Sequence, residues 1–113
     1  MTRGEDFRRI VRTGNRVGGA SCIVHAVSRV SHEEPARFGF IVSKAVGNAV
    51  TRNRVRRQMQ AMAQAHLGAG VAGVDVIVRV LPAAVDSSFT DLSAQFAQQL
   101  TRAIRRAVRT GEP

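Results

Sequence analysis

Apolar residues recur along the chain with two different spacings, one typical of helices and one typical of strands. The helical spacing predicts helices at residues 3–13, at residues 48–66 and in a segment that begins after Ser88. The predicted strands are at residues 21–30, 37–44 and 74–81, with room for a further short strand at residues 14–20. The predicted order is therefore α-β-β-α-β-α, which is typical of one sheet with helices packed on it.

The apolar positions of each element predict which of its faces is buried. In the strand at residues 21–30, one face carries Ile23, His25 and Val27, and the other carries Cys22, Val24 and Ala26. The strand at residues 74–81 is apolar on both faces and is predicted to be central. The predicted helix stripes are Val55, Met59, Met62 and His66, and then Leu92, Phe96, Leu100, Ala103, Ile104, Ala107 and Val108. Together they predict a single α+β domain that spans residues 1–113.

Polar residues and glycines mark the predicted helix ends. Thr2 and Glu5 have the spacing of a capping box, and Gly14 is placed to end the first helix. Asn48 is the predicted N-cap of the second helix, and Gly47 before it allows a sharp entry.

The composition adds a charge that stability does not require. The net charge is +9, and 16 of the 17 basic residues are Arg. Because self-repulsion destabilises a compact domain, this excess predicts a polyanionic partner, with nucleic acid first and an anionic membrane surface second. No apolar run is long enough to span a membrane, and the first residues lack the apolar region of a signal peptide. The lone Cys22 and three separated His residues predict neither a disulfide nor a zinc site.

The basic residues gather in residues 43–59, SKAVGNAVTRNRVRRQM. No acidic residue occurs between Glu34 and Asp75, so Arg52 and Arg56 form an uncompensated i,i+4 pair on the predicted helix. A solvated helix face is the ordinary alternative, but such faces usually alternate in charge. Phosphates would remove the repulsion, and the positive end of the helix would add to the attraction. The segment therefore indicates a helix that binds nucleic acid.

The run FGFIVSKAVGNAVTRNRVRRQM resembles the signature of the bacterial ribonuclease P protein subunit. EDFRRIVRTG is similar to the first helix of that family, VDVIVRVLPAA to its last strand, and SFTDLSAQFAQQLTRAIRR to its closing helix. The resemblance implies an α-β-β-β-α-β-α sandwich with a left-handed βαβ crossover, as in a small-subunit ribosomal protein domain and an elongation factor G domain. Periodicity alone would favour a right-handed crossover, which is the default.

The resemblance also implies a function. The family's protein is an accessory subunit that joins a catalytic RNA, and the RNA holds the Mg²⁺ ions that act in removing the 5′ leader of precursor tRNA. The implied partners are this RNA and precursor tRNA in the cytoplasm, with no membrane and no protein partner. The residues that match the family's contacts to the catalytic RNA are Asn48, Arg52, Asn53, Arg54, Arg56 and Arg57. The leader cleft, between the first helix and the sheet, would be lined by Phe7, Val11, Ile23, His25 and Lys44.

The chain departs from the family pattern at three positions. The family usually has an aromatic residue at the position of Val11, often one at His25, and often a second basic residue at Ala45. Stacking on leader bases is therefore expected to be weaker. From burial statistics alone, Phe7 and Ile23 would be ordinary core residues, and only the resemblance places them in a cleft.

Two other functions fit the basic helix. One is an RNA-binding protein of the ribosome with the same fold and no leader recognition. The other is a helix-turn-helix DNA binder, which is disfavoured because a strand precedes the arginine helix. The acidic residues Asp75, Asp86 and Asp91 are predicted at a strand edge, a turn and a helix start, so the sequence offers no pair of catalytic carboxylates.

Overall fold

The computed structural model describes residues 4–29 and 33–111, and these form helices on a four-stranded sheet. The helices are α1 (Gly4–Thr13), α2 (Ala49–Gly68) and α3 (Phe89–Gly111), and the short 3₁₀ helices are η1 (Lys44–Val46) and η2 (Pro82–Asp86). The strands are β1 (Asn15–Gly18), β2 (Cys22–Ser28), β3 (Arg37–Ile41) and β4 (Val74–Val80). The order α-β-β-β-α-β-α confirms the prediction, including the short strand before β2. Thr2 of the predicted capping box lies outside the described residues.

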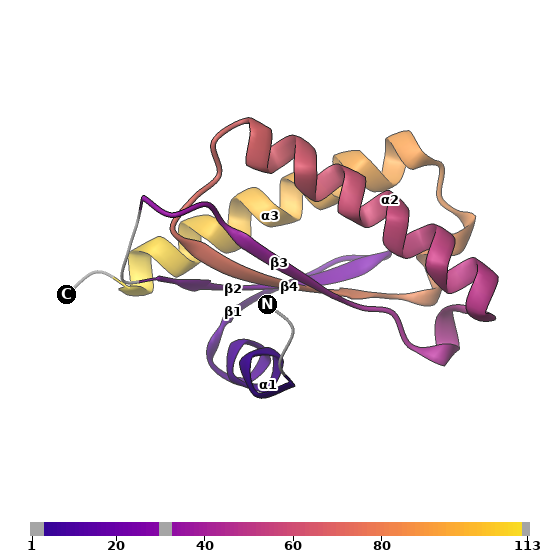
Figure 1. Cartoon of the computed structure of the whole chain (residues 1–113), viewed down its shortest axis with the longest axis horizontal. Coiled ribbons are helices and arrows are strands. Elements are labelled where there is room, and N and C mark those ends of the chain that lie inside the picture. Colours follow the sequence, from indigo (N-terminus) through magenta and orange to yellow (C-terminus); the bar gives the residue numbers. More distant parts are fainter. Residues whose placement is uncertain (1–3, 30–32, 112–113) are drawn as a thin grey trace.

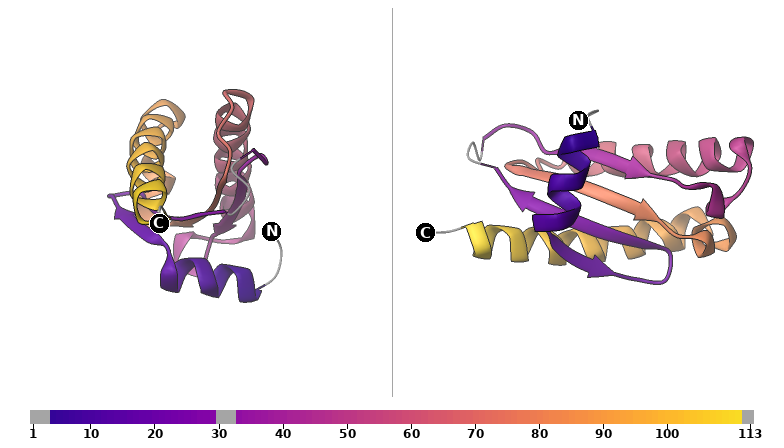
Figure 2. Two further views of the ribbon diagram at one scale, coloured as in Figure 1. Left: turned by 90° about the vertical axis from the view of Figure 1, so that its left-hand side faces the viewer. Right: turned by 90° about the horizontal axis from the view of Figure 1, so that it is seen from below.

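Strand β4 is central, as its two apolar faces predict. The strand order is β1-β2-β4-β3, and β4 pairs antiparallel with β2 and parallel with β3. Helix α2 connects the two parallel strands (Figure 1). Seen from the side of α1 (Figure 2, right), β3 and β4 both point to the right, β4 lies below β3 in the view, and α2 lies behind the sheet. This arrangement makes the crossover left-handed. The unusual handedness implied by the resemblance is therefore present.

The sheet separates two unequal layers. Helices α2 and α3 cover one face, and α1 lies alone against the other (Figure 1; Figure 2, left). The main core lies under α2 and α3, where Cys22, Val24 and Ala26 meet Phe96 with no exposed surface. The predicted helix stripes are confirmed with one exception: Val108 is 40% exposed. Ala103 and Ala107 have no exposed surface, so the buried stripe of α3 runs through them and leaves Val108 at its rim.

Contacts between distant parts of the chain set the end of β3 and the end of α1. The strand predicted at residues 37–44 is too long, because β3 is an edge strand and ends at Ile41, where its pairing with β4 ends. The chain then turns through η1 toward the start of α2. Gly14 ends α1 as predicted, and the reason is its close approach to β2: an added Cβ would lie 3.2 Å from the carbonyl oxygen of Ala26, and 2.3 Å from that of Ile10.

Candidate RNA interface

The basic helix α2 begins at a well-formed cap. The side-chain oxygen of Asn48 accepts a hydrogen bond from the backbone N–H of Thr51 at 2.9 Å, which confirms the predicted N-cap. Gly47 has a φ of 156°, and a Cβ there would lie 2.9 Å from Cγ2 of Thr51. The first turn contains no acidic residue. The positive end of the helix dipole therefore adds to the arginine charges without an acid to offset it.

The arginine face of α2 consists of Arg52, Asn53, Arg54, Arg56 and Arg57. Asn53, Arg54 and Arg57 are exposed, and Arg52 and Arg56 are half-buried. Arg56 donates a hydrogen bond to the side-chain oxygen of Asn53 at 3.4 Å, while the buried Nε of Arg52 has no hydrogen-bond partner. Over residues 4–29 and 33–111, no ion pair involves any of these arginines. The charges thus remain unneutralised, as in a surface that binds phosphates.

A second candidate surface is the sheet face on the side of α1, called here the α1 face. Strand register places two neighbouring rows on it: Arg16, His25 and Ile77, and then Ile23, Arg79 and Ile41. Helix α1 crosses one part of this face and leaves the part toward η1 uncovered (Figure 2, right). Arg79 is exposed there, and Ile23 and Ile41 are half-buried. The uncovered part therefore combines apolar surface with a guanidinium.

His25 lies at the base of the α1 face and is only 4% exposed. Burial lowers the pKa of His25 below 6.5, and the positive charges of Arg16 and Arg79 lower it further. This shift favours the neutral form of the ring. The buried Nδ1 atom has no hydrogen-bond partner among the described residues. A neutral, buried ring is not suited to bind a phosphate as a cation would.

The predicted leader residues share the α1 side of the molecule. Val11 is half-buried on α1, while Phe7 belongs to the same helix but its side chain lies outside the described part. Lys44 is exposed in η1, which projects toward the same side of the sheet as α1 (Figure 1). The sequence reasoning missed Arg16 and Arg79. Strand alternation could have placed Arg79 on one face of β4, but only the pairing of β2 with β4 puts it opposite Ile23.

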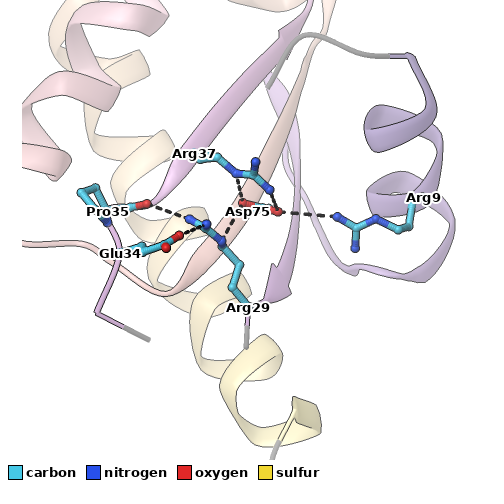
Figure 3. A network of polar contacts seen from close by, with 6 residues as sticks. All are labelled: Arg9, Arg29, Glu34, Pro35, Arg37 and Asp75. Carbon is cyan, nitrogen blue, oxygen red and sulfur yellow. Dashed lines mark hydrogen bonds and ion pairs between the residues drawn. The ribbon is translucent and has the colours of Figure 1, made fainter. Parts of the chain in front are cut away.

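A cluster of charged residues lies beside α1 (Figure 3). Asp75 was predicted at a strand edge, and this is wrong: it is 2% exposed on the central strand. Arg37 donates to both of its carboxylate oxygens, at 2.8 and 2.7 Å. Arg29 and Arg9 form further ion pairs with it, at 3.6 and 3.5 Å. Arg29 also contacts the carboxylate of Glu34. A buried carboxylate is tolerated here because guanidinium groups surround it.

Within residues 4–29 and 33–111, no three His, Cys, Asp or Glu side chains come together as metal ligands. No helix in this part of the chain is long and apolar enough to cross a membrane. The strongest chemical features that the structure describes are thus the arginine face of α2 and the α1 face.

Known proteins resemble the chain over almost its whole length. The family model of ribonuclease P matches residues 1–107. The ribonuclease P protein component of Clavibacter michiganensis is 41% identical, with 93% of this chain and 92% of the relative covered, and that of Nocardioides is 38% identical, with 91% and 86% covered. The Staphylococcus aureus RNase P protein superposes with a TM-score of 0.74 at 26% identity, over 95% of this chain and 93% of that one. The Thermotoga maritima protein, at 19% identity, shows the same fold with a TM-score of 0.80 over 90% of this chain and 97% of its own. The chain therefore belongs to the family of ribonuclease P protein components, the accessory subunits of a ribonucleoprotein endoribonuclease that matures the 5′ ends of tRNA.

Proposed function

We propose that this protein binds the catalytic RNA of ribonuclease P with the arginine face of α2, and the single-stranded 5′ leader of precursor tRNA with the α1 face. The observation that carries the proposal is the unneutralised charge of the arginine face. The two surfaces lie on opposite sides of the sheet (Figure 1), so one molecule would hold two RNA segments at once.

The arginine face suits a folded RNA whose phosphates come close together. A guanidinium presents a planar fork of donors that matches phosphate oxygens, and displaced counterions add a favourable entropy. The Asn48 cap aligns the first turn of α2, so its free N–H groups would reach the same phosphates. Val50, which is 76% exposed beside this cap, would lie against a ribose or base edge.

The α1 face suits an extended single strand. Ile23 and Ile41 offer apolar surface to unstacked bases, and the guanidiniums of Arg16 and Arg79 would meet phosphates on either side of His25. The His25 ring, which is only 4% exposed, would support this surface from below. We place Lys44 at the edge of the uncovered part of the α1 face, because η1 projects to the same side of the sheet as α1.

We assign the Mg²⁺ ions of the reaction to the RNA subunit. Mg²⁺ requires oxygen ligands, and the buried carboxylate of Asp75 is already held by arginines. The residues described here therefore do not fit a magnesium site, and we derive no step through the metal. The contribution we assign to the chain is to bind and orient the RNA segments.

We place the protein in the cytoplasm, where precursor tRNA is transcribed in a bacterium, and we treat residues 1–113 as one domain. The decisive experiment mixes the protein with a bacterial ribonuclease P RNA and a precursor tRNA at low Mg²⁺. We expect 5′-matured tRNA to form faster than with the RNA alone. Binding to this RNA that is no tighter than to ribosomal RNA of equal length, without any stimulation of cleavage, would favour a general RNA-binding role.

A further inference from the structure

The carboxylate of Asp75 connects three separate parts of the fold (Figure 3). Arg37 belongs to the edge strand β3, Arg29 directly follows β2, and Arg9 belongs to α1. Asp75 is itself on β4, between β2 and β3. One buried side chain thus ties α1 to the centre of the sheet.

The ion pairs of Asp75 differ in how firmly they are held. Arg37 makes a bidentate pair at 2.8 and 2.7 Å, and Arg29 also donates to the carbonyl oxygen of Pro35 at 3.0 Å. Arg9 approaches at 3.5 Å, and its side chain is 47% exposed. If the carboxylate lost its charge, the guanidiniums would repel one another, and the ion pair that ties Arg9 of α1 to β4 would be lost.

Helix α1 depends on such contacts for its place. It has ten residues, which is too short to be stable in water on its own. Its packing rests on Ile10, which is fully buried, and on the close contact of Gly14 with the sheet. Ile10 lies in the second half of α1, and Gly14 directly follows its last residue. Arg9 to Asp75 adds an ion pair from the middle of the helix.

We infer that Asp75 is a positioning residue for leader binding. Through Arg9, it holds α1 across the sheet, and so it sets the width of the uncovered part of the α1 face. This inference rests on the proposed binding of the leader to the α1 face. Asp75 is too buried to touch RNA itself. Its loss should therefore weaken leader binding and leave the arginine face of α2, on the other side of the sheet, unchanged.

The test uses holoenzyme reconstituted with Asp75→Asn, Arg9→Gln and the double variant. Dissociation constants are measured for precursor tRNA with a leader of several nucleotides and for mature tRNA. We expect each single variant to lose about tenfold in affinity for the precursor, which is within the range of coupling that residues without ligand contact exert. Mature tRNA should be bound as before. The double variant should be no worse than either single one, because both changes break the same pair.

Arg12→Gln is the matched control. Arg12 is an exposed arginine in the last turn of the same helix, so the variant loses the same charge. Its effect should add to that of Asp75→Asn. Additivity between Asp75→Asn and Arg9→Gln as well would overturn the inference. So would a precursor affinity unchanged by Asp75→Asn, since the carboxylate would then have no part in leader binding.

A second readout separates this inference from the proposed function. In the NMR titration of His25, release of α1 should raise the pKa of the ring toward 6.5, because its burial is the main cause of the lowered value. If wild-type holoenzyme bound precursor and mature tRNA equally, the leader proposal would fail, while the titration would still report on α1. If Asp75→Asn prevents folding, Arg9→Gln decides: an unchanged His25 pKa in that variant shows that the ion pair does not hold α1.

Discussion

The side-chain amide of Gln99 donates a hydrogen bond to the backbone carbonyl of Cys22 at 2.8 Å, between α3 and β2. The same amide donates to the carbonyl of Val17 at 3.2 Å, and its oxygen accepts from the Cys22 thiol at 3.3 Å. Gln99 is 6% exposed within the otherwise apolar contact of α3 with the sheet. Gly19 passes so close that an added Cβ would lie 2.8 Å from Cδ of Gln99. A buried polar side chain thus satisfies two strand carbonyls at once.

Gln99→Ala should destabilise the protein by about 2–4 kcal/mol, because it leaves the carbonyls of Val17 and Cys22 buried without this donor and opens a cavity. Urea unfolding followed by circular dichroism measures the change. Gln98→Ala is the control, since Gln98 is the exposed neighbour on the same helix. Equal unfolding midpoints for the two variants would show that the amide contributes nothing to stability.

The Cys22 thiol should be unreactive in the native protein. Burial raises its pKa to about 11, so almost no thiolate exists at pH 8. We expect a thiol reagent at pH 8 to react only as fast as the chain unfolds, and rapidly in denaturant. Because the native pKa is raised, native stability should also fall as pH increases from 9 toward 11. Rapid labelling of the folded protein would contradict the buried position of the thiol.

Loss of Arg52 and Arg56 should weaken binding to the catalytic RNA. Each phosphate contact removed lowers the slope of log K against log salt by about 1. The double alanine variant, titrated at several salt concentrations, should therefore lose about two units of slope if each arginine meets one phosphate. Arg105→Ala is the control, because it removes an exposed arginine of the same charge from α3. A wild-type slope in the double variant would place the RNA elsewhere.

His25 should make stability depend on pH. Its pKa is lowered in the folded protein, so the unfolded chain takes up a proton near pH 6.5 while the native ring stays neutral. Stability that is present above pH 6.5 is then lost as pH falls through the lowered native pKa. Urea unfolding at pH 7.5 and 5.5 should show this loss, at no more than about 1.4 kcal/mol per pH unit. His25→Phe removes the titration and should reduce the slope, whereas a wild-type slope in this variant would assign the effect to other groups.

The arginine face of α2 could be predicted from the sequence because its determinants are local. The Asn48 cap, the unbroken helical period and the absence of acids are all read within one helix, where neighbours in sequence are neighbours in space. The order of strands and helices followed from the apolar spacing for the same reason. The left-handed crossover came from family resemblance, since local spacing carries no information about handedness.

Only the tertiary structure placed Arg79 opposite Ile23, enclosed Asp75 among arginines and brought Gln99 to Cys22. Alternation along a strand predicts which residues share a face, but it does not predict which strand pairs with it or what covers that face. The register of β2 and β3 on β4 decides which charges meet, and the packing of α1 and α3 decides which of them lose water. The burial of His25, and with it the lowered pKa, is set by the same long-range contacts.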